Sequence, residues 1–319
     1  MTPPALPAGY DRSNEYTRII IDEALARGVD VVVLDPDIGE LELTHGGRTH
    51  TVIQSLSELT SAIAFRRCDD KALTRRVLVA AGLSVPPGRI ATGDRADEDF
   101  LAEHGSVVVK PCRGEGGAGI SVGVTDPDGL RTAVATARRT CDRVLLEALV
   151  PGDDLRVLVI DGRVVAASVR RPPTVVGDGS STVRALIEAR NDERASTLGP
   201  AMVTPLDDIT DACVRTAGHD LDEVLGEGVE VKVRRTANLH SGGTIHDVTP
   251  CLHPDLADAA IRATAAVDLP VAGIDLMVAS PEEPTHVLIE VNEQPGLANH
   301  EPQPTAQRYL DLLFPATAA

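Results

Sequence analysis

Apolar residues recur at helical spacing near the start of the chain and then change to the spacing of strands. Residues 14–28, "NEYTRIIIDEALARG", have this helical spacing and end at a glycine, which predicts a helix. The run 29–36, "VDVVVLDP", is mostly β-branched and predicts a buried strand. Residues 40–55 alternate between apolar and polar on both sides of Gly46–Gly47, which predicts a hairpin. A small α/β unit is therefore expected here.

The middle of the chain alternates predicted helices with predicted strands. Residues 69–82 have helical spacing and end at Gly82, and the segment after them is extended because it precedes prolines. From about residue 84 to 150 the expected order is strand, helix, strand, glycine-rich turn, strand, helix, strand. The helices are expected at 95–105 and 126–139, and the last strand at 143–149.

The remaining part of the chain combines two hairpins with further helices. Residues 153–171 predict a hairpin that turns at Asp161–Gly162, and 181–228 are mixed but mostly helical. A strand at 229–235, a helix at 253–270 and a hairpin at 271–296 with a long acidic turn complete the pattern.

Proline–glycine stretches near 85–88 and 151–152 are the best candidates for domain boundaries. They divide the chain into an N-terminal α/β subdomain at 1–84, a central subdomain at 85–150 and a C-terminal subdomain at 151–319.

Composition and charge restrict the classes of partner. The formal charge of −18 argues against general nucleic-acid binding, although local arginines and lysines can still bind a small anion. The five cysteines are scattered without a CxxC pair, which fits a reducing compartment. There is no basic and apolar leader pattern and no apolar run of about 18 residues, so a cytoplasmic protein without a membrane partner is expected.

The first candidate site is the stretch 107–122, "VVVKPCRGEGGAGISV". Lys110 closes a β-branched run, and four glycines follow within six residues. The lysine precedes the glycines, so this is not the common phosphate loop that opens a helix. Backbone N–H groups of a flexible hairpin tip can nevertheless wrap phosphate oxygens, with Lys110 adding positive charge. A hairpin tip without a ligand is the alternative.

The second candidate site lies in the last hairpin. Glu290 and Asn292 are two residues apart, so they share one face of a strand, and Asp275 on the partner strand can join them. Two carboxylates and an amide oxygen suit Mg²⁺ held together with phosphates. Solvated acids on a half-buried strand are the alternative.

Together these stretches resemble the ATP-grasp ligases. The sequences "VVVKPCRGEGGAGI", "LLEALVPGDDLRVLVIDGRVVAA" and "GIDLMV…LIEVNEQPG" are similar to the family's loop, hinge and magnesium strands. Further stretches, including "CDDKALTRRVLVAAGLSVPPG" and "RRTANLHSGGTIHDVTPCLHP", resemble the ATP-grasp modules of cyanophycin synthetase and of bifunctional glutathione synthases. The resemblance covers about residues 13–314. It implies an α+β ATP-grasp fold of three α/β subdomains, with ATP held between two antiparallel sheets. The central subdomain would act as a lid, and the C-terminal subdomain would carry the magnesium and substrate site.

The resemblance also implies roles for individual residues. ATP would be contacted by Lys71, Lys110, Gly114, Gly117, Gly119, the hinge residues Glu147, Ala148 and Val150, and Asp154. Asp275, Glu290 and Asn292 would hold Mg²⁺, with two ions expected and Mn²⁺ as a substitute. Arg156, Arg171 and Arg234 would clamp anions, with ion pairs as the alternative. Asn238, Ser241, Gly242 and Gly243 would cradle an acyl-phosphate, and His240 and His300 would lie at the substrate site, with a helix cap or a surface position as the alternative for His300.

The resemblance implies an ATP-dependent carboxylate–amine ligase that forms an amide through an acyl-phosphate and releases ADP. Neither a Mur-ligase-like half nor a γ-glutamylcysteine-forming half is found in the sequence, and His240 and Ser241 stand where relatives commonly carry Ser and Thr. Small amino-acid or peptide-like substrates are therefore expected. A homodimer is expected as well. A ligase that adds glutamate to a peptide or protein tail is one alternative, and a non-catalytic nucleotide-binding regulator is another.

Overall fold

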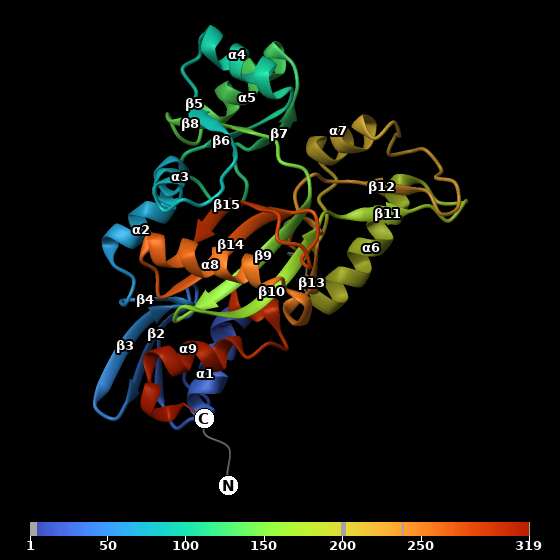
Figure 1. The fold of residues 1–319 in the computed structure, drawn as a ribbon. Coiled ribbons are helices and arrows are strands. Elements are labelled where there is room, and N and C mark those ends of the chain that lie inside the picture. The colour runs from blue at the N-terminus through green and yellow to red at the C-terminus, as the bar shows by residue number, and fades with distance from the viewer. Residues whose placement is uncertain (1–4, 199–201, 238, 319) are drawn as a thin grey trace. The chain divides into compact units, whose positions relative to one another are not determined.

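The computed structural model describes residues 5–198, 202–237 and 239–318, which belong to two compact units. The first unit combines Met1–Ser168 with Asp247–Ala319, and the second is Val169–His246. Figure 1 shows the elements of each unit along the chain.

The first unit opens with a helix and a four-stranded antiparallel sheet. Helix α1 (Glu15–Ala26) begins at Asn14, whose side chain accepts a hydrogen bond from the Thr17 N–H. Strands β1 (Asp30–Asp35), β2 (Glu40–His45), β3 (Arg48–Ile53) and β4 (Leu56–Ser57) follow in sequential order. The predicted helix and the hairpin at Gly46–Gly47 are confirmed, and α9 (Thr305–Leu313) packs on α1.

The prediction that residues 29–36 form a buried strand was wrong in one respect. The segment is a strand, but β1 alternates between exposed and partly buried positions, and Val32 and Leu34 are half exposed. Within the described sheet β1 pairs only with β2, so one face and one edge remain without cover. Val31 and Val33 pack toward the core from the other face.

Two helices connect this sheet to the next. Helix α2 (Ala62–Asp69) was not predicted from the sequence, whereas α3 (Lys71–Ala80) was. Asp70 lies between them as the N-cap of α3.

The central part of the first unit is a four-stranded antiparallel sheet covered by helices. The strands are β5 (Gly88–Ile90), β6 (Val107–Pro111), β7 (Ser121–Val124) and β8 (Val144–Ala148), in the order β5-β8-β6-β7. Helices α4 (Arg95–His104) and α5 (Pro127–Arg138) contact this sheet, as Figure 1 shows. The predicted sequence of strands, helices and glycine-rich turn is confirmed.

The last sheet of the first unit carries the second candidate site. Strands β10 (Arg163–Arg171), β9 (Asp153–Ile160), β14 (Val271–Val278) and β15 (His286–Asn292) lie side by side in that order. Both predicted hairpins are confirmed, and α8 (Pro254–Val267) packs against β9 and β14. Most aliphatic side chains of β9, β14 and α8 are buried.

The second unit has a small core of its own. Strands β11 (Thr174–Val176) and β12 (Glu230–Lys232) form an antiparallel pair, and α6 (Val183–Leu198) and α7 (Asp208–Thr216) pack beside them. Strand β13 (Thr244–Asp247) ends this stretch. Short 3₁₀ helices occur at Tyr10–Arg12, Leu239–Ser241, Thr249–Cys251, Leu297–His300 and Pro315–Thr317.

The described helices and antiparallel sheets confirm the predicted α+β class. Among the residues that the structure describes, no helix is both long enough and apolar enough to span a membrane.

Candidate functional site

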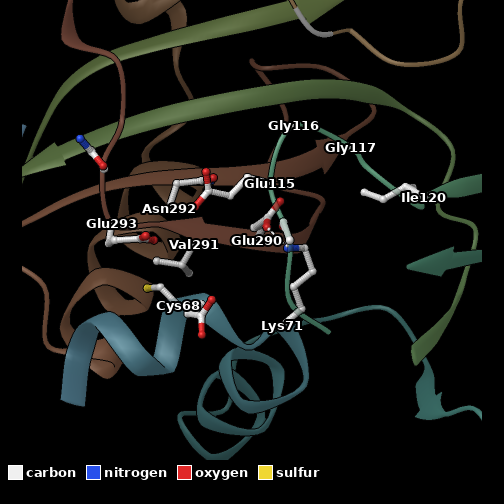
Figure 2. Close-up of a pocket in the computed structure, with 13 residues that line it drawn as sticks. Cys68, Lys71, Glu115, Gly116, Gly117, Ile120, Glu290, Val291, Asn292 and Glu293 are labelled. Atoms are coloured by element: carbon white, nitrogen blue, oxygen red, sulfur yellow. Dashed lines mark hydrogen bonds and ion pairs between the residues drawn. The ribbon is translucent and has the colours of Figure 1, made fainter. Parts of the chain in front are cut away.

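A pocket of about 270 Å³ lies in the first unit, where the α2–α3 junction, the glycine-rich loop and the end of β15 meet (Figure 2). Its lining residues are Cys68, Asp69, Lys71, Gly114, Glu115, Gly116, Gly117, Ile120, Glu290, Val291, Asn292, Glu293 and Gln294. Five of the residues predicted from the sequence are among them, namely Lys71, Gly114, Gly117, Glu290 and Asn292. The pocket therefore joins the two candidate sites that the sequence suggested separately.

The start of α3 is set by a helix cap. The Asp70 carboxylate accepts hydrogen bonds from the backbone N–H groups of Ala72 and Leu73, each 3.1 Å long. The backbone N–H of Lys71 donates to the carbonyl oxygen of Cys112 at 2.8 Å. These contacts fix the first turn of the helix beside the glycine-rich loop.

The ammonium group of Lys71 connects the loop with the end of β15. It donates to the carbonyl oxygen of Gly114 at 3.0 Å and lies 3.0 Å from Glu290 Oε1. Figure 2 shows the lysine reaching up from α3 toward that carboxylate. Lys71 thus provides the positive charge of the pocket, beside a carboxylate that is one of the predicted magnesium ligands.

The predicted magnesium ligands lie on neighbouring strands. Asp275 on β14 is directly opposite Glu290 on β15, and Gly273 is opposite Asn292. The Asn292 amide nitrogen is 3.4 Å from Asp275 Oδ2 and donates to the Gly273 carbonyl at 3.1 Å. The structure therefore brings the three side chains together, as the period-2 spacing predicted.

The electrostatics of the pocket fit a divalent cation. Burial raises the pKa of the Glu293 carboxyl above its usual range, and the nearby Glu115, Glu290 and Asp69 raise it further. Among the described residues no group of three or more His, Cys, Asp or Glu side chains is placed to hold a metal ion, and the predicted set contains two such residues with Asn292 as its third member. Carboxylate and amide oxygens, together with this excess of negative charge, are the donor chemistry that Mg²⁺ prefers.

Cys68 lines the same pocket but is not a candidate nucleophile. Burial raises the pKa of its thiol strongly, and Glu293 and Glu290 raise it further. A thiol held in its neutral form is a poor nucleophile.

The glycine-rich loop needs glycine for two different reasons. Gly116 and Gly117 have φ angles of 64° and 82°, with open space where a Cβ would lie. Gly119 has a φ of 73°, and a Cβ there would come within 2.9 Å of Thr140 Oγ1. Gly116 and Gly117, at the tip of the loop, are therefore required for their backbone conformation. Gly119, at its base, is required because it packs closely against the end of α5.

Lys110 and Glu147 form an ion pair away from the lining of this pocket. The Lys110 ammonium is 2.6 Å from Glu147 Oε2, and both side chains are only 5% exposed. Lys110 on β6 is opposite Leu145 on β8, so Glu147 is its diagonal neighbour on the same sheet face. Arg75 also approaches Glu147, at 3.9 Å. The positive charge of Lys110 near the end of β6 is thus neutralised by Glu147, which was also predicted to contact ATP.

The other predicted hinge residues continue from β8 into β9. Ala148 ends β8, Val150 follows it, and both are partly buried. Asp154 lies on β9 opposite Met277 of β14. None of the three lines the pocket described above.

Arg156 and His300 were both predicted to contact substrate. Arg156 is opposite Asp275 and makes a bidentate ion pair with it, the Nη2–Oδ2 distance being 3.0 Å. The interstrand ion pair considered for Arg156 is therefore present. His300 ends the 3₁₀ helix Leu297–His300 and is buried, so the surface position considered for it was wrong.

The remaining predicted residues belong to the second unit. Arg234 is buried, and its Nη2 donates to Asp207 Oδ2 at 2.7 Å and to the Pro205 carbonyl at 3.3 Å. Gly242 has a φ of 91°, and a Cβ there would lie 1.9 Å from Thr204 Oγ1, so any other residue would strain the backbone and displace Thr204.

The other predicted residues of the second unit differ in their exposure to solvent. Arg171 ends β10 and is exposed, Ser241 is partly buried and Gly243 is buried. Asn238 and the side chain of His240 lie outside the described residues.

Sequence reasoning missed several pocket residues. Asp69, Glu115 and Glu293 line the pocket, yet none was assigned a role. Glu115 lies between Gly114 and Gly116, and Glu293 directly follows Asn292. Both residues are therefore adjacent to motifs that the sequence analysis had already identified. Asp69 begins the stretch 69–82 that was predicted as one helix, but in the structure it ends α2, which was not predicted.

Comparison with known families identifies the fold. Residues 78–203 match "Prokaryotic glutathione synthetase, ATP-grasp domain", and residues 222–306 match "RimK-like ATP-grasp domain". The chain also resembles the crystal structure of a bifunctional glutathione synthetase from Pasteurella multocida, with a TM-score of 0.68 and 24% identity over 96% of this chain and 44% of that chain. These matches confirm the predicted ATP-grasp fold.

Curated relatives match over nearly the whole chain. Cyanophycin synthetase from Nostoc sp. is 31% identical over 94% of this chain and 35% of its own length. The bifunctional glutathione biosynthesis protein GshAB from Clostridium perfringens is 28% identical over 96% of this chain and 42% of its own length. The chain thus spans less than half the length of these curated relatives. Both names agree with the resemblance seen in the sequence motifs.

Proposed function

Because this chain belongs to the ATP-grasp superfamily, we propose that it is an ATP-dependent carboxylate–amine ligase. It would transfer the γ-phosphate of ATP to a substrate carboxylate. An amine would then attack the acyl-phosphate, leaving an amide and releasing ADP and phosphate.

One observation carries this proposal. Lys71 contacts both the Gly114 carbonyl in the glycine-rich loop and the Glu290 carboxylate, which is opposite Asp275. A cation, a flexible backbone loop and an oxygen donor set thus meet in one pocket. Phosphoryl transfer needs these three features, since most of its catalysis is positioning and neutralisation of charge.

The residues of the first unit would act on the nucleotide. Asp275, Glu290 and Asn292 would hold two Mg²⁺ ions, with Mn²⁺ as a substitute. When bound, the metal supplies positive charge at the reacting phosphates. Lys71 would leave Glu290 to contact a phosphate oxygen, and the loop at 114–119 would close over the phosphates and exclude water. Lys110, Gly119, the hinge at 147–150 and Asp154 would bind the rest of the nucleotide.

The residues of the second unit would act on the acyl-phosphate. The Arg234 guanidinium is suited to a planar carboxylate or phosphate oxygen pair, and Arg171 would add a second cation. The turn at 241–243, with Asn238, would donate backbone and amide N–H groups to the developing charge. The snug fit of Gly242 against Thr204 would hold this turn in one conformation.

Small amino-acid or peptide-like molecules are the substrates we propose, with His240, His300 and Arg156 near them and a homodimer as the working form. A panel of amino acids and dipeptides, tested for ADP release, would identify the pair. ADP release that requires both a carboxylate and an amine substrate supports the ligase. Activity only on acidic peptides or protein tails would favour the alternative ligase, and ATP binding without turnover would favour a regulator.

A further inference from the structure

A second pocket of about 210 Å³ lies in the first unit beside the junction of α2 and α3. Its lining residues are Arg66, Asp70, Ala72, Leu73, Arg76, Arg113 and Arg143. The volume is far above the roughly 15 Å³ that one water molecule requires. The proposed ligase reaction gives no role to any of these side chains.

The charge of this pocket is opposite to that of the whole chain. Four arginines line it, and only Asp70 inside it and the adjacent Asp69 oppose them. The chain carries a formal charge of −18, so a group of four guanidinium groups around two carboxylates stands out. Such a local excess of positive charge attracts anions whatever the net charge of the protein.

Asp69 and Asp70 accept hydrogen bonds from only a few of the N–H groups of these arginines. Arg66 Nη1 donates to Asp69 Oδ2 at 2.5 Å, and Arg143 Nη1 donates to Asp70 Oδ2 at 2.7 Å. Asp70 also caps α3, so part of its acceptor capacity is already taken by backbone N–H groups. Each guanidinium has five N–H donors, and most of them remain for another partner.

The other two arginines are held more loosely. Arg113 Nε is 3.4 Å from Asp69 Oδ2 and 4.0 Å from Asp70 Oδ2. Arg76 is exposed, and among the described residues it has no carboxylate within ion-pair distance. Arg76 on α3 and Arg113 in the loop after β6 are thus arginines beyond those that the two aspartates hold closely.

We propose that this arginine pocket binds a multivalent oxyanion, a molecule that carries phosphate or paired carboxylate groups. Arginine forks match both groups in a bidentate manner, and several converging forks favour a multivalent ligand. The pocket is separate from the one proposed for ATP, although Arg113 directly precedes Gly114 of the glycine-rich loop. Bound anion would draw Arg113 away from Asp69 at the base of that loop.

Calorimetric titration of the intact chain tests this site. Inorganic phosphate and succinate would be titrated separately at constant ionic strength, with and without saturating Mg²⁺ and a non-hydrolysable ATP analogue. We expect saturable binding of at least one probe that persists with the analogue present. The double variant Arg66→Ala, Arg76→Ala should weaken it about tenfold or more, and the single variant Arg76→Ala by a smaller factor. The preferred probe shows whether phosphate or carboxylate is the recognised group.

Arg95→Ala is the matched control, because Arg95 is a 90% exposed helix residue that pairs with Asp99 at 3.6 Å. It should leave probe binding unchanged. Absence of saturable binding while the analogue is bound, or equal binding by the double variant and wild type, would overturn the proposal. The titration without the analogue requires neither ATP binding nor turnover, so it tests the arginine pocket even if the ligase proposal fails.

Discussion

Lys110 and Glu147 lie on the same face of neighbouring strands and pair at 2.6 Å with almost no exposure to solvent. Removal of the lysine leaves a buried carboxylate, and among the described residues the remaining cation within ion-pair distance is Arg75, at 3.9 Å. We therefore expect Lys110→Met to lower the free energy of unfolding by about 3–5 kcal/mol in urea denaturation.

The exposed ion pair of Arg131 and Glu98 offers a control at the same distance of 2.6 Å. Arg131→Met should cost less than about 1 kcal/mol, because solvent screens that pair. The double variant Lys110→Met, Glu147→Leu should recover most of the lost stability. If Lys110→Met costs no more than Arg131→Met, the buried pair has no structural importance.

The metal site gives a second prediction. Glu290→Gln removes one anionic oxygen opposite Asp275 and the carboxylate partner of Lys71. Turnover at ordinary Mg²⁺ should fall by about 100-fold or more, because charge neutralisation at the phosphates supplies several kcal/mol. Glu283→Gln, in the exposed turn of the same hairpin, should retain full activity. Full turnover by Glu290→Gln would refute the ligand assignment.

The glycine-rich loop gives a third prediction. Hydrogen exchange at residues 112–119 should slow when Mg²⁺ and a non-hydrolysable ATP analogue bind, because the backbone N–H groups become ordered over phosphate. The hairpin tip at Gly46–Gly47 also has positive φ angles and open space, so it is an internal control whose exchange should not change. Unaltered exchange at 112–119 with the analogue demonstrably bound would leave the loop as a simple turn.

The acidic pocket gives a prediction about pH. The pKa of Glu293 is raised in the folded state, mainly by burial, so the folded protein binds a proton more tightly than the unfolded chain. Stability must then fall as pH rises from the ordinary glutamate pKa, about 4.3, through the raised value. Glu293→Gln should therefore increase the free energy of unfolding at pH 7, and the gain should vanish near pH 4. Denaturation at both pH values, with Glu282→Gln as an exposed control, measures this difference. An equal gain at both pH values would exclude ionisation as the cause.

The sequence predicted most elements because their patterns are local. The helix at 15–26 and the hairpin at Asp161–Gly162 follow from apolar spacing and turn residues alone. The spacing of Glu290 and Asn292 likewise placed two ligands on one face. The pairing of Lys110 with Glu147 was out of reach, because it depends on how β6 and β8 align across 37 positions of chain. The exposure of β1 was missed for a related reason, since a β-branched run does not reveal that the strand is at a sheet edge.

The transfer of the γ-phosphate to a substrate carboxylate is the central claim, and isotope transfer tests it most directly. Once the substrate panel has identified the carboxylate, that carboxylate is labelled with ¹⁸O, and the nucleotide and phosphate products are analysed by mass spectrometry. An acyl-phosphate mechanism predicts ADP as the nucleotide product and one ¹⁸O atom in each released phosphate. AMP as the product, or phosphate without label, would contradict the proposed mechanism.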